Sequence, residues 1–84
     1  FAEVREPVTG RRMTVATTLP GVQFYSGNFL SAFPGKRGST YDKHGGFCLE
    51  TQLFPDSPNK PTYPTSRLLP GQVWAHETVF RFFA

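Results

Sequence analysis

The residues best suited to chemistry lie close together in the segment HGGFCLETQ, from His44 to Gln52. Glu50 stands in an otherwise apolar run, where a carboxylate can take a proton from a substrate as a general base. Because side chains alternate along a strand, Cys48, Glu50 and Gln52 are expected on one face. If that face is exposed, Glu50 is an ordinary solvated residue. If it lines a cleft, Glu50 can act on a hydroxyl-rich substrate, with Gln52 and Gln23 as neutral hydrogen-bond donors. The residues alone leave both interpretations open.

Three other side chains are weaker candidates for chemistry. His44 lies beside a glycine pair without a nearby carboxylate, and His76 alternates with aromatic residues near the end of the chain. Both are expected to be packing or surface residues rather than proton-transfer groups. Cys48 has no adjacent histidine that would activate its thiol, and two histidines with one cysteine lack the spacing of metal ligands. Neither phosphate-binding glycine motif is present.

The elements that must position these residues follow the periodicity of strands. FAEVREPVTGRRMTVATTL predicts a hairpin around a turn at Pro7–Gly10, and alternation in the next strand places Gln23 and Tyr25 opposite Val22 and Phe24. No window has the spacing of an amphipathic helix, so the chain is predicted to be all-β. Further strands are expected at Val22–Ser26, at Phe47–Gln52 and within Gln72–Ala84, separated by a long loop at Gly27–Gly46 and a proline-rich surface segment at Leu53–Gly71.

Composition limits the class of protein. Eighty-four residues allow one domain, and 38% hydrophobic and 15% aromatic residues indicate a globular β-rich chain. The net charge of +3 is scattered, which argues against nucleic-acid binding. No apolar run approaches the roughly 20 residues that span a bilayer. One cysteine forms no internal disulfide and favours a reducing compartment, hence the cytoplasm. Because the chain begins with Phe1, we expect a processed or truncated piece.

Three motifs, in order along the chain, resemble the C-terminal quarter of the aldose 1-epimerases, or galactose mutarotases. They are LPGVQFYSGNFL (Leu19–Leu30), YDKHGGFCLETQLFPDSPNKP (Tyr41–Pro61) and LLPGQ (Leu68–Gln72), followed by the aromatic last strand. The resemblance covers nearly all 84 residues. It implies that residues 1–84 form a single C-terminal fragment of a large mutarotase-like β-sandwich, incomplete as a stand-alone domain.

The resemblance also implies a mechanism without metal or organic cofactor. Aldohexoses such as galactose and glucose would change anomer when Glu50, as general base, takes the proton of the C1 hydroxyl and a histidine protonates the ring oxygen. Gln23 matches a sugar-contacting glutamine of the family. The acid histidine of the family lies in a His-x-Tyr/Phe-Phe-Asn motif far upstream, which neither His44 nor His76 fits. The chain alone is therefore expected to be nearly inactive until the upstream part of the fold, in the same or a second chain, completes it.

Two other classes of function stay open from the sequence. A non-catalytic carbohydrate-binding or regulatory module would keep Gln23 and Glu50 as a weak sugar platform. A structural or interaction module would only add its sheet to the edge of a partner. Within the enzymes, a sugar-phosphate epimerase is a further alternative, because Lys36, Arg37 and Lys43 could meet a phosphate.

Overall fold

The computed structural model describes all 84 residues, Phe1–Ala84, and confirms the all-β prediction. Two main sheets are formed, and both are antiparallel. The first has the order β1-β2-β7, and the second contains β3 and β6. The strands are β1 (Ala2–Arg5), β2 (Arg12–Thr17), β3 (Gly21–Tyr25), β6 (Cys48–Gln52) and β7 (Thr78–Phe83). Helical structure is limited to two 3-10 turns, η1 (Lys36–Gly38) and η2 (Ser57–Asn59). No helix has the length and apolar character needed to cross a membrane.

The predicted turn between β1 and β2 is confirmed, and the side chain of Glu6 organises it. The Glu6 carboxylate accepts hydrogen bonds from the backbone N–H groups of Val8 and Thr9, each at 2.7 Å, and from the Thr9 hydroxyl. Gly10 completes the turn with a φ of 77°, a left-handed conformation that glycine adopts without steric cost. The hydrogen bonds from Thr9, and then that from Val8, stabilise the ionised carboxylate and lower the pKa of Glu6 below its ordinary value.

Two predicted elements differ from the structure. The expected loop at Gly27–Gly46 contains a small hairpin, formed by β4 (Phe33–Pro34) and β5 (Thr40–Tyr41). The last strand begins at Thr78 rather than near Gln72. Its partner strand β2 ends at Thr17, and beyond that point only one backbone hydrogen bond, from the Thr18 N–H to the Glu77 carbonyl oxygen at 3.0 Å, continues the pairing. The other predicted strand boundaries agree to within two residues.

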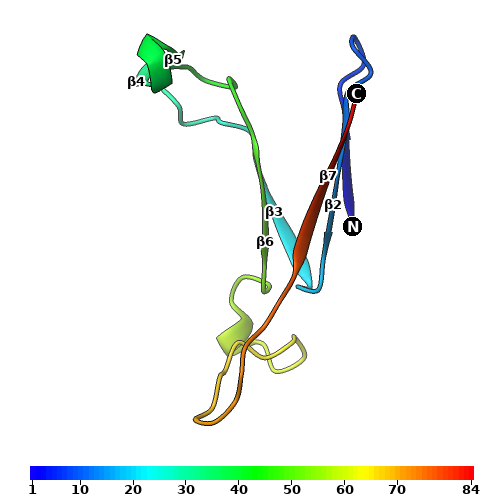
Figure 1. The fold of residues 1–84 in the computed structure, drawn as a ribbon. Coiled ribbons are helices and arrows are strands. Elements are labelled where there is room, and N and C mark those ends of the chain that lie inside the picture. Colours follow the sequence, from blue (N-terminus) through cyan, green and yellow to red (C-terminus); the bar gives the residue numbers. More distant parts are fainter.

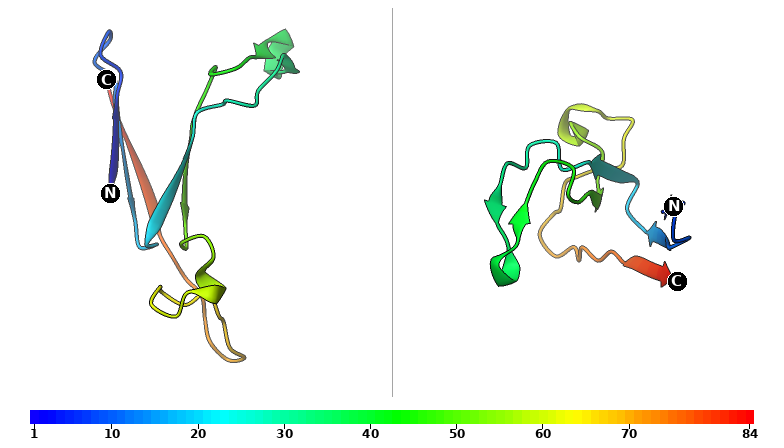
Figure 2. Two further views of the ribbon diagram at one scale, coloured as in Figure 1. Left: turned by 180° about the vertical axis from the view of Figure 1, so that it is seen from behind. Right: turned by 90° about the horizontal axis from the view of Figure 1, so that it is seen from above.

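The two sheets diverge from a shared end and leave the molecule open between them (Figure 1). At that end β2 leads into β3 and β7 begins, and the proline-rich segment extends beyond it. Figure 2 shows the same separation from behind and from above. The radius of gyration is 16.8 Å, whereas a compact domain of this length has about 12 Å.

The hydrophobic core of the described chain is very small. Four of the 84 residues are buried, and Val15 is the only hydrophobic side chain among the buried core residues. Large apolar side chains remain exposed, including Phe24 at 60% and Phe82 at 76%. Burial of a phenylalanine side chain contributes about 1.5–3 kcal/mol. These 84 residues by themselves therefore lack most of the hydrophobic stabilisation that their large apolar side chains could provide if buried.

Candidate functional site

The register of β3 and β6 brings Gln23 and Glu50 together. The two residues are Cα partners in the antiparallel ladder, and directly opposite residues project from the same face of a sheet. Tyr25 and Cys48 form another pair on this face, and Gln52 also belongs to it. The structure thus confirms the predicted alternation in both strands and adds the pairing between them, which the sequence did not provide. We call this surface the polar face of the β3–β6 sheet.

The Glu50 carboxylate is free to interact with a ligand. Glu50 is exposed, and its side chain takes part in none of the hydrogen bonds or ion pairs of the structure. The two ion pairs are Arg12–Glu3 and Lys60–Asp56. The Gln23 amide nitrogen donates to the carbonyl oxygen of Phe24 at 3.3 Å, which leaves its carbonyl oxygen and its second N–H available. The polar face therefore offers a proton acceptor beside an amide, a combination that can bind and deprotonate a hydroxyl group.

The opposite face of the same sheet is apolar and is turned toward the first sheet. Phe24 lies beside Phe47, with ring centroids 6.4 Å apart. Val22 and Thr51 line a hollow together with Val15 of β2. The β3–β6 sheet thus has one face made for packing and one face with hydrogen-bonding groups, as a strand pair at the surface of a sandwich requires.

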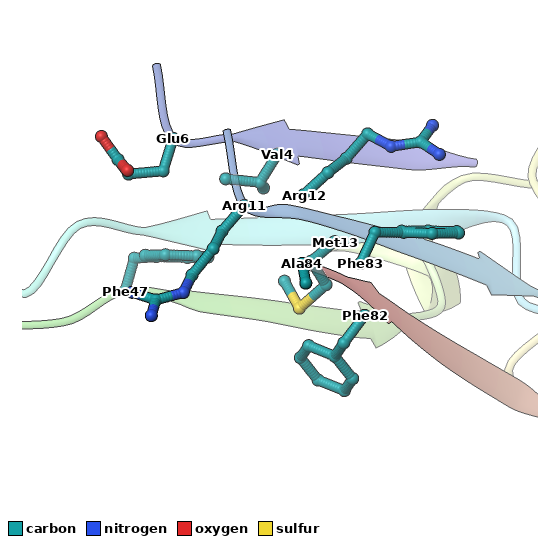
Figure 3. A pocket seen from close by; sticks show the side chains of 9 residues that line it. All are labelled: Val4, Glu6, Arg11, Arg12, Met13, Phe47, Phe82, Phe83 and Ala84. Atoms are coloured by element: carbon teal, nitrogen blue, oxygen red, sulfur yellow. The ribbon is translucent and has the colours of Figure 1, made fainter. Parts of the chain in front are cut away.

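A hollow larger than the one beside Val22 and Thr51 lies elsewhere and is unsuited to a sugar. It has a volume of about 430 Å³ and is lined by Val4, Met13 and Phe82 of the first sheet and by Phe47, which precedes β6. Figure 3 shows these apolar side chains around the hollow, with Arg11 and Glu6 at its margin. Its apolar lining fits side chains of a protein core better than a hydroxyl-rich ligand, and Glu50 does not contribute to it.

The two histidines have hydrogen-bond partners away from Glu50. His44 Nε2 lies 3.2 Å from Asn28 Oδ1. His76 Nδ1 lies 3.1 Å from Thr18 Oγ1, and its ring lies 4.6 Å from that of Trp74, centroid to centroid. Both residues are exposed, which agrees with the packing or surface roles expected for them. Cys48 is a free, exposed cysteine on the polar face.

Sequence reasoning missed a group of threonines that joins the two sheets. Thr51 Oγ1 of β6 lies 2.8 Å from Thr78 Oγ1 of β7, and Thr78 Oγ1 lies 3.1 Å from Thr17 Oγ1 of β2. Thr17 and Thr78 are 61 residues apart in the sequence. The only available signal was the alternation of side chains along each strand, which places each of these threonines on the face of its strand that points toward the other sheet.

The chain is similar to proteins of one family over nearly its whole length. The family model described as aldose 1-epimerase matches residues 1–81, and the chain belongs to that family. It is 52% identical over 82 residues to galactose mutarotase of Mus musculus and 51% identical to that of Homo sapiens, in each case over 96% of this chain and 24% of the relative. Aldose 1-epimerase of Escherichia coli (strain K12) is 40% identical over 75 residues, covering 87% of this chain and 22% of that protein. The chain thus spans about a quarter of the length of these relatives.

Proposed function

We propose that this chain provides the general base of an aldose 1-epimerase that interconverts the α and β anomers of aldohexoses such as galactose and glucose. The observation that carries the proposal is the direct pairing of Gln23 with Glu50 on an exposed polar face. The family membership favours this chemistry over other uses of a carboxylate beside an amide.

The reaction needs one proton acceptor and one proton donor. Glu50 takes the proton from the C1 hydroxyl of the cyclic sugar while an acid on the completing part of the fold protonates the ring oxygen. The bond between C1 and the ring oxygen breaks, which gives the open-chain aldehyde. After rotation about the C1–C2 bond, the ring oxygen attacks the other face of C1; the acid group recovers its proton from the ring hydroxyl, and Glu50 returns its proton to the C1 oxygen. Gln23 holds the sugar beside Glu50 by hydrogen bonds to its hydroxyl groups.

The proposal includes completion by further strands. We infer that residues 1–84 form one part of a larger β-sandwich, and that the rest is supplied in the same chain or by a second one. The open shape, the single buried hydrophobic core residue and the exposed phenylalanines support this inference. Without the acid group, catalysis by the described residues alone should be slight, because each acid or base is typically worth about 10²–10⁴-fold in rate.

A chimaera tests the assignment of Glu50. The matched 82-residue segment of the Mus musculus galactose mutarotase is replaced by this chain, and the change in optical rotation of freshly dissolved α-galactose and α-glucose is followed. We expect an active chimaera in which Glu50→Gln lowers kcat by about 10²–10⁴-fold, whereas Gln23→Ala mainly raises KM. Glu77→Gln is the matched control, since the exposed Glu77 side chain makes no hydrogen bond or ion pair. Unchanged turnover in Glu50→Gln would refute the assignment.

The separate 84-residue polypeptide provides a second test. We expect no acceleration of mutarotation by this polypeptide alone, and recovery of activity when the upstream portion of the relative is added. Normal mutarotation by the 84 residues alone would contradict the need for completion. Galactose binding that depends on Glu50 without any epimerisation in the chimaera would instead indicate a non-catalytic carbohydrate-binding module.

A further inference from the structure

The three threonine hydroxyls form a directed chain of hydrogen bonds. Thr17 Oγ1 lies 3.1 Å from the carbonyl oxygen of Glu77, and because a carbonyl only accepts, the Thr17 hydroxyl must donate its single proton there. Thr17 Oγ1 also accepts the backbone N–H of Leu19 at 3.1 Å. Its contact with Thr78 then requires Thr78 to donate. The proton of Thr78 is thereby used, so the contact of Thr78 with Thr51 requires Thr51 to donate.

The chain of donors therefore runs from Thr51 through Thr78 and Thr17 to the Glu77 carbonyl, and no other order satisfies these contacts. All three threonine side chains are half-buried, where a lost partner is more costly than at the exposed surface. Replacing Thr78 by valine would remove the middle of the chain. Thr51 would lose its acceptor, and Thr17 would lose one of its two donors.

The position of these hydrogen bonds in the fold links them to the orientation of Glu50. The link from Thr51 to Thr78 joins the β3–β6 sheet to the first sheet near the end where the two sheets meet (Figure 1). Away from this end the sheets diverge, so the Thr51–Thr78 contact fixes one point of β6 relative to the first sheet. Thr51 directly follows Glu50, and its side chain projects from the opposite face of the strand. Rotation of β6 about its axis would move both side chains together.

We propose that Thr78 is a positioning residue for Glu50: through the Thr51 hydroxyl it fixes the orientation of β6 and thereby the direction of the Glu50 carboxylate. The inference rests on the proposed function, in which Glu50 is the general base. A base must lie within hydrogen-bond distance of the hydroxyl that it deprotonates. Small displacements of such a group lower the rate of the chemical step more than they weaken sugar binding, because the binding contacts are shared with Gln23 and other residues.

The test uses the active chimaera with substitutions at Thr78. A displacement of about 1 Å can cost roughly 10²-fold in rate, and for the smaller rotation expected in Thr78→Val we expect kcat to fall about tenfold, with KM within about twofold of the unsubstituted protein. Thr78→Ser keeps the hydroxyl and should restore kcat to within about twofold. Thr62→Val is the matched control, because Thr62 is exposed and its hydroxyl makes no hydrogen bond. All rates are measured where circular dichroism shows each variant fully folded.

The outcomes separate this inference from the assignment of Glu50. If Glu50→Gln abolishes turnover while Thr78→Val leaves kcat unchanged, the positioning role is refuted and the general base is not. If Glu50→Gln leaves turnover unchanged, both fail. Should Thr78→Val not fold, Thr51→Val removes the terminal donor alone and must show the same selective loss of kcat, and unchanged kcat refutes the proposal. In the folded proteins, the double substitution of Thr51 and Thr78 should lose no more than Thr78→Val, because Thr78→Val already removes the Thr51–Thr78 hydrogen bond.

Discussion

Gly27 offers a quantitative test of the packing around the backbone that immediately precedes β6, the strand of Glu50. It is buried and has a φ of 71°. Its carbonyl oxygen accepts hydrogen bonds from the backbone N–H groups of Leu30 and His44, at 3.2 and 3.1 Å. A β-carbon at this position would lie 2.6 Å from the carbonyl oxygen of Gly46 and 3.2 Å from Leu30 Cδ1. Gly27→Ala must therefore displace backbone just before β6.

The size of the effect can be separated into two parts with a control glycine. A left-handed conformation costs a residue with a β-carbon about 1–2 kcal/mol, and the loss of chain freedom in the unfolded state returns about 0.4–1 kcal/mol. Gly10 has a similar φ of 77° but nothing within 4 Å of the added carbon, so Gly10→Ala should cost only the remaining 1 kcal/mol or so. The clash at Gly27 adds about 1–3 kcal/mol, as overpacking does elsewhere.

Urea unfolding of the chimaera, followed by tryptophan fluorescence, measures both variants. We expect Gly27→Ala to lower the free energy of unfolding by about 2–4 kcal/mol, and Gly10→Ala by about 1 kcal/mol. Because the displaced backbone precedes β6, Gly27→Ala should also lower kcat, whereas Gly10→Ala should not. Equal destabilisation by the two substitutions would show that backbone conformation alone accounts for the loss, and would refute the packing described around Gly46.

Three further outcomes are expected. The lowered pKa of Glu6 means that its carboxylate stabilises the folded state above its ordinary pKa of 4.5 and ceases to do so as the pH falls through the lower folded value. Below pH 4.5 the urea midpoint of the chimaera should therefore fall less steeply with pH in Glu6→Gln than in the unsubstituted protein. Identical profiles of midpoint against pH would contradict this role. The Arg12 guanidinium lies 4.0 Å from the ring centroid of Phe83 and pairs with Glu3 at 3.2 Å. Phe83→Leu should therefore lower the free energy of unfolding by about 0.5–1 kcal/mol beyond the effect of the lost apolar area, while Glu3→Gln should change it by less than about 1 kcal/mol. The separate 84-residue polypeptide should self-associate through its exposed phenylalanines, and Phe82→Glu should shift it toward monomer in analytical ultracentrifugation, since Phe82 is 76% exposed.

Much of the fold followed from the sequence because strand periodicity and turn residues act locally. The hairpin around Pro7–Gly10 and the alternation around Gln23 and Glu50 each depend on a few neighbouring residues, and the structure has both. The length of the last strand does not depend on its own residues. QVWAHE has a suitable alternation, but its potential partner β2 ends at Thr17, so pairing stops at Thr78.

The sequence was sufficient to propose the residues of the candidate site and the face of the strand on which each lies, but not how the two strands pair. Alternation placed Gln23 and Glu50 each on the polar face of its strand, but a register slip by one residue would have separated them, and only the ladder shows that they are partners. The threonine chain was inaccessible for the same reason, because it depends on contacts between Thr17, Thr51 and Thr78 from three different strands.

The pairing of β2 with β7 has a kinetic consequence. Thr17 and Thr78 meet across 61 residues of chain, whereas β1 and β2 are joined by a short turn. From the logarithmic growth of loop entropy, closing the longer loop costs about 2 kcal/mol more than closing the turn. The β1–β2 hairpin should thus form early and present the unpaired edge of β2 until β7 arrives. During that interval the backbone N–H and C=O groups along this edge of β2, which β7 covers in the folded protein, can pair with another strand. A peptide with the sequence of β7 should therefore slow refolding of the chimaera by competing for this edge.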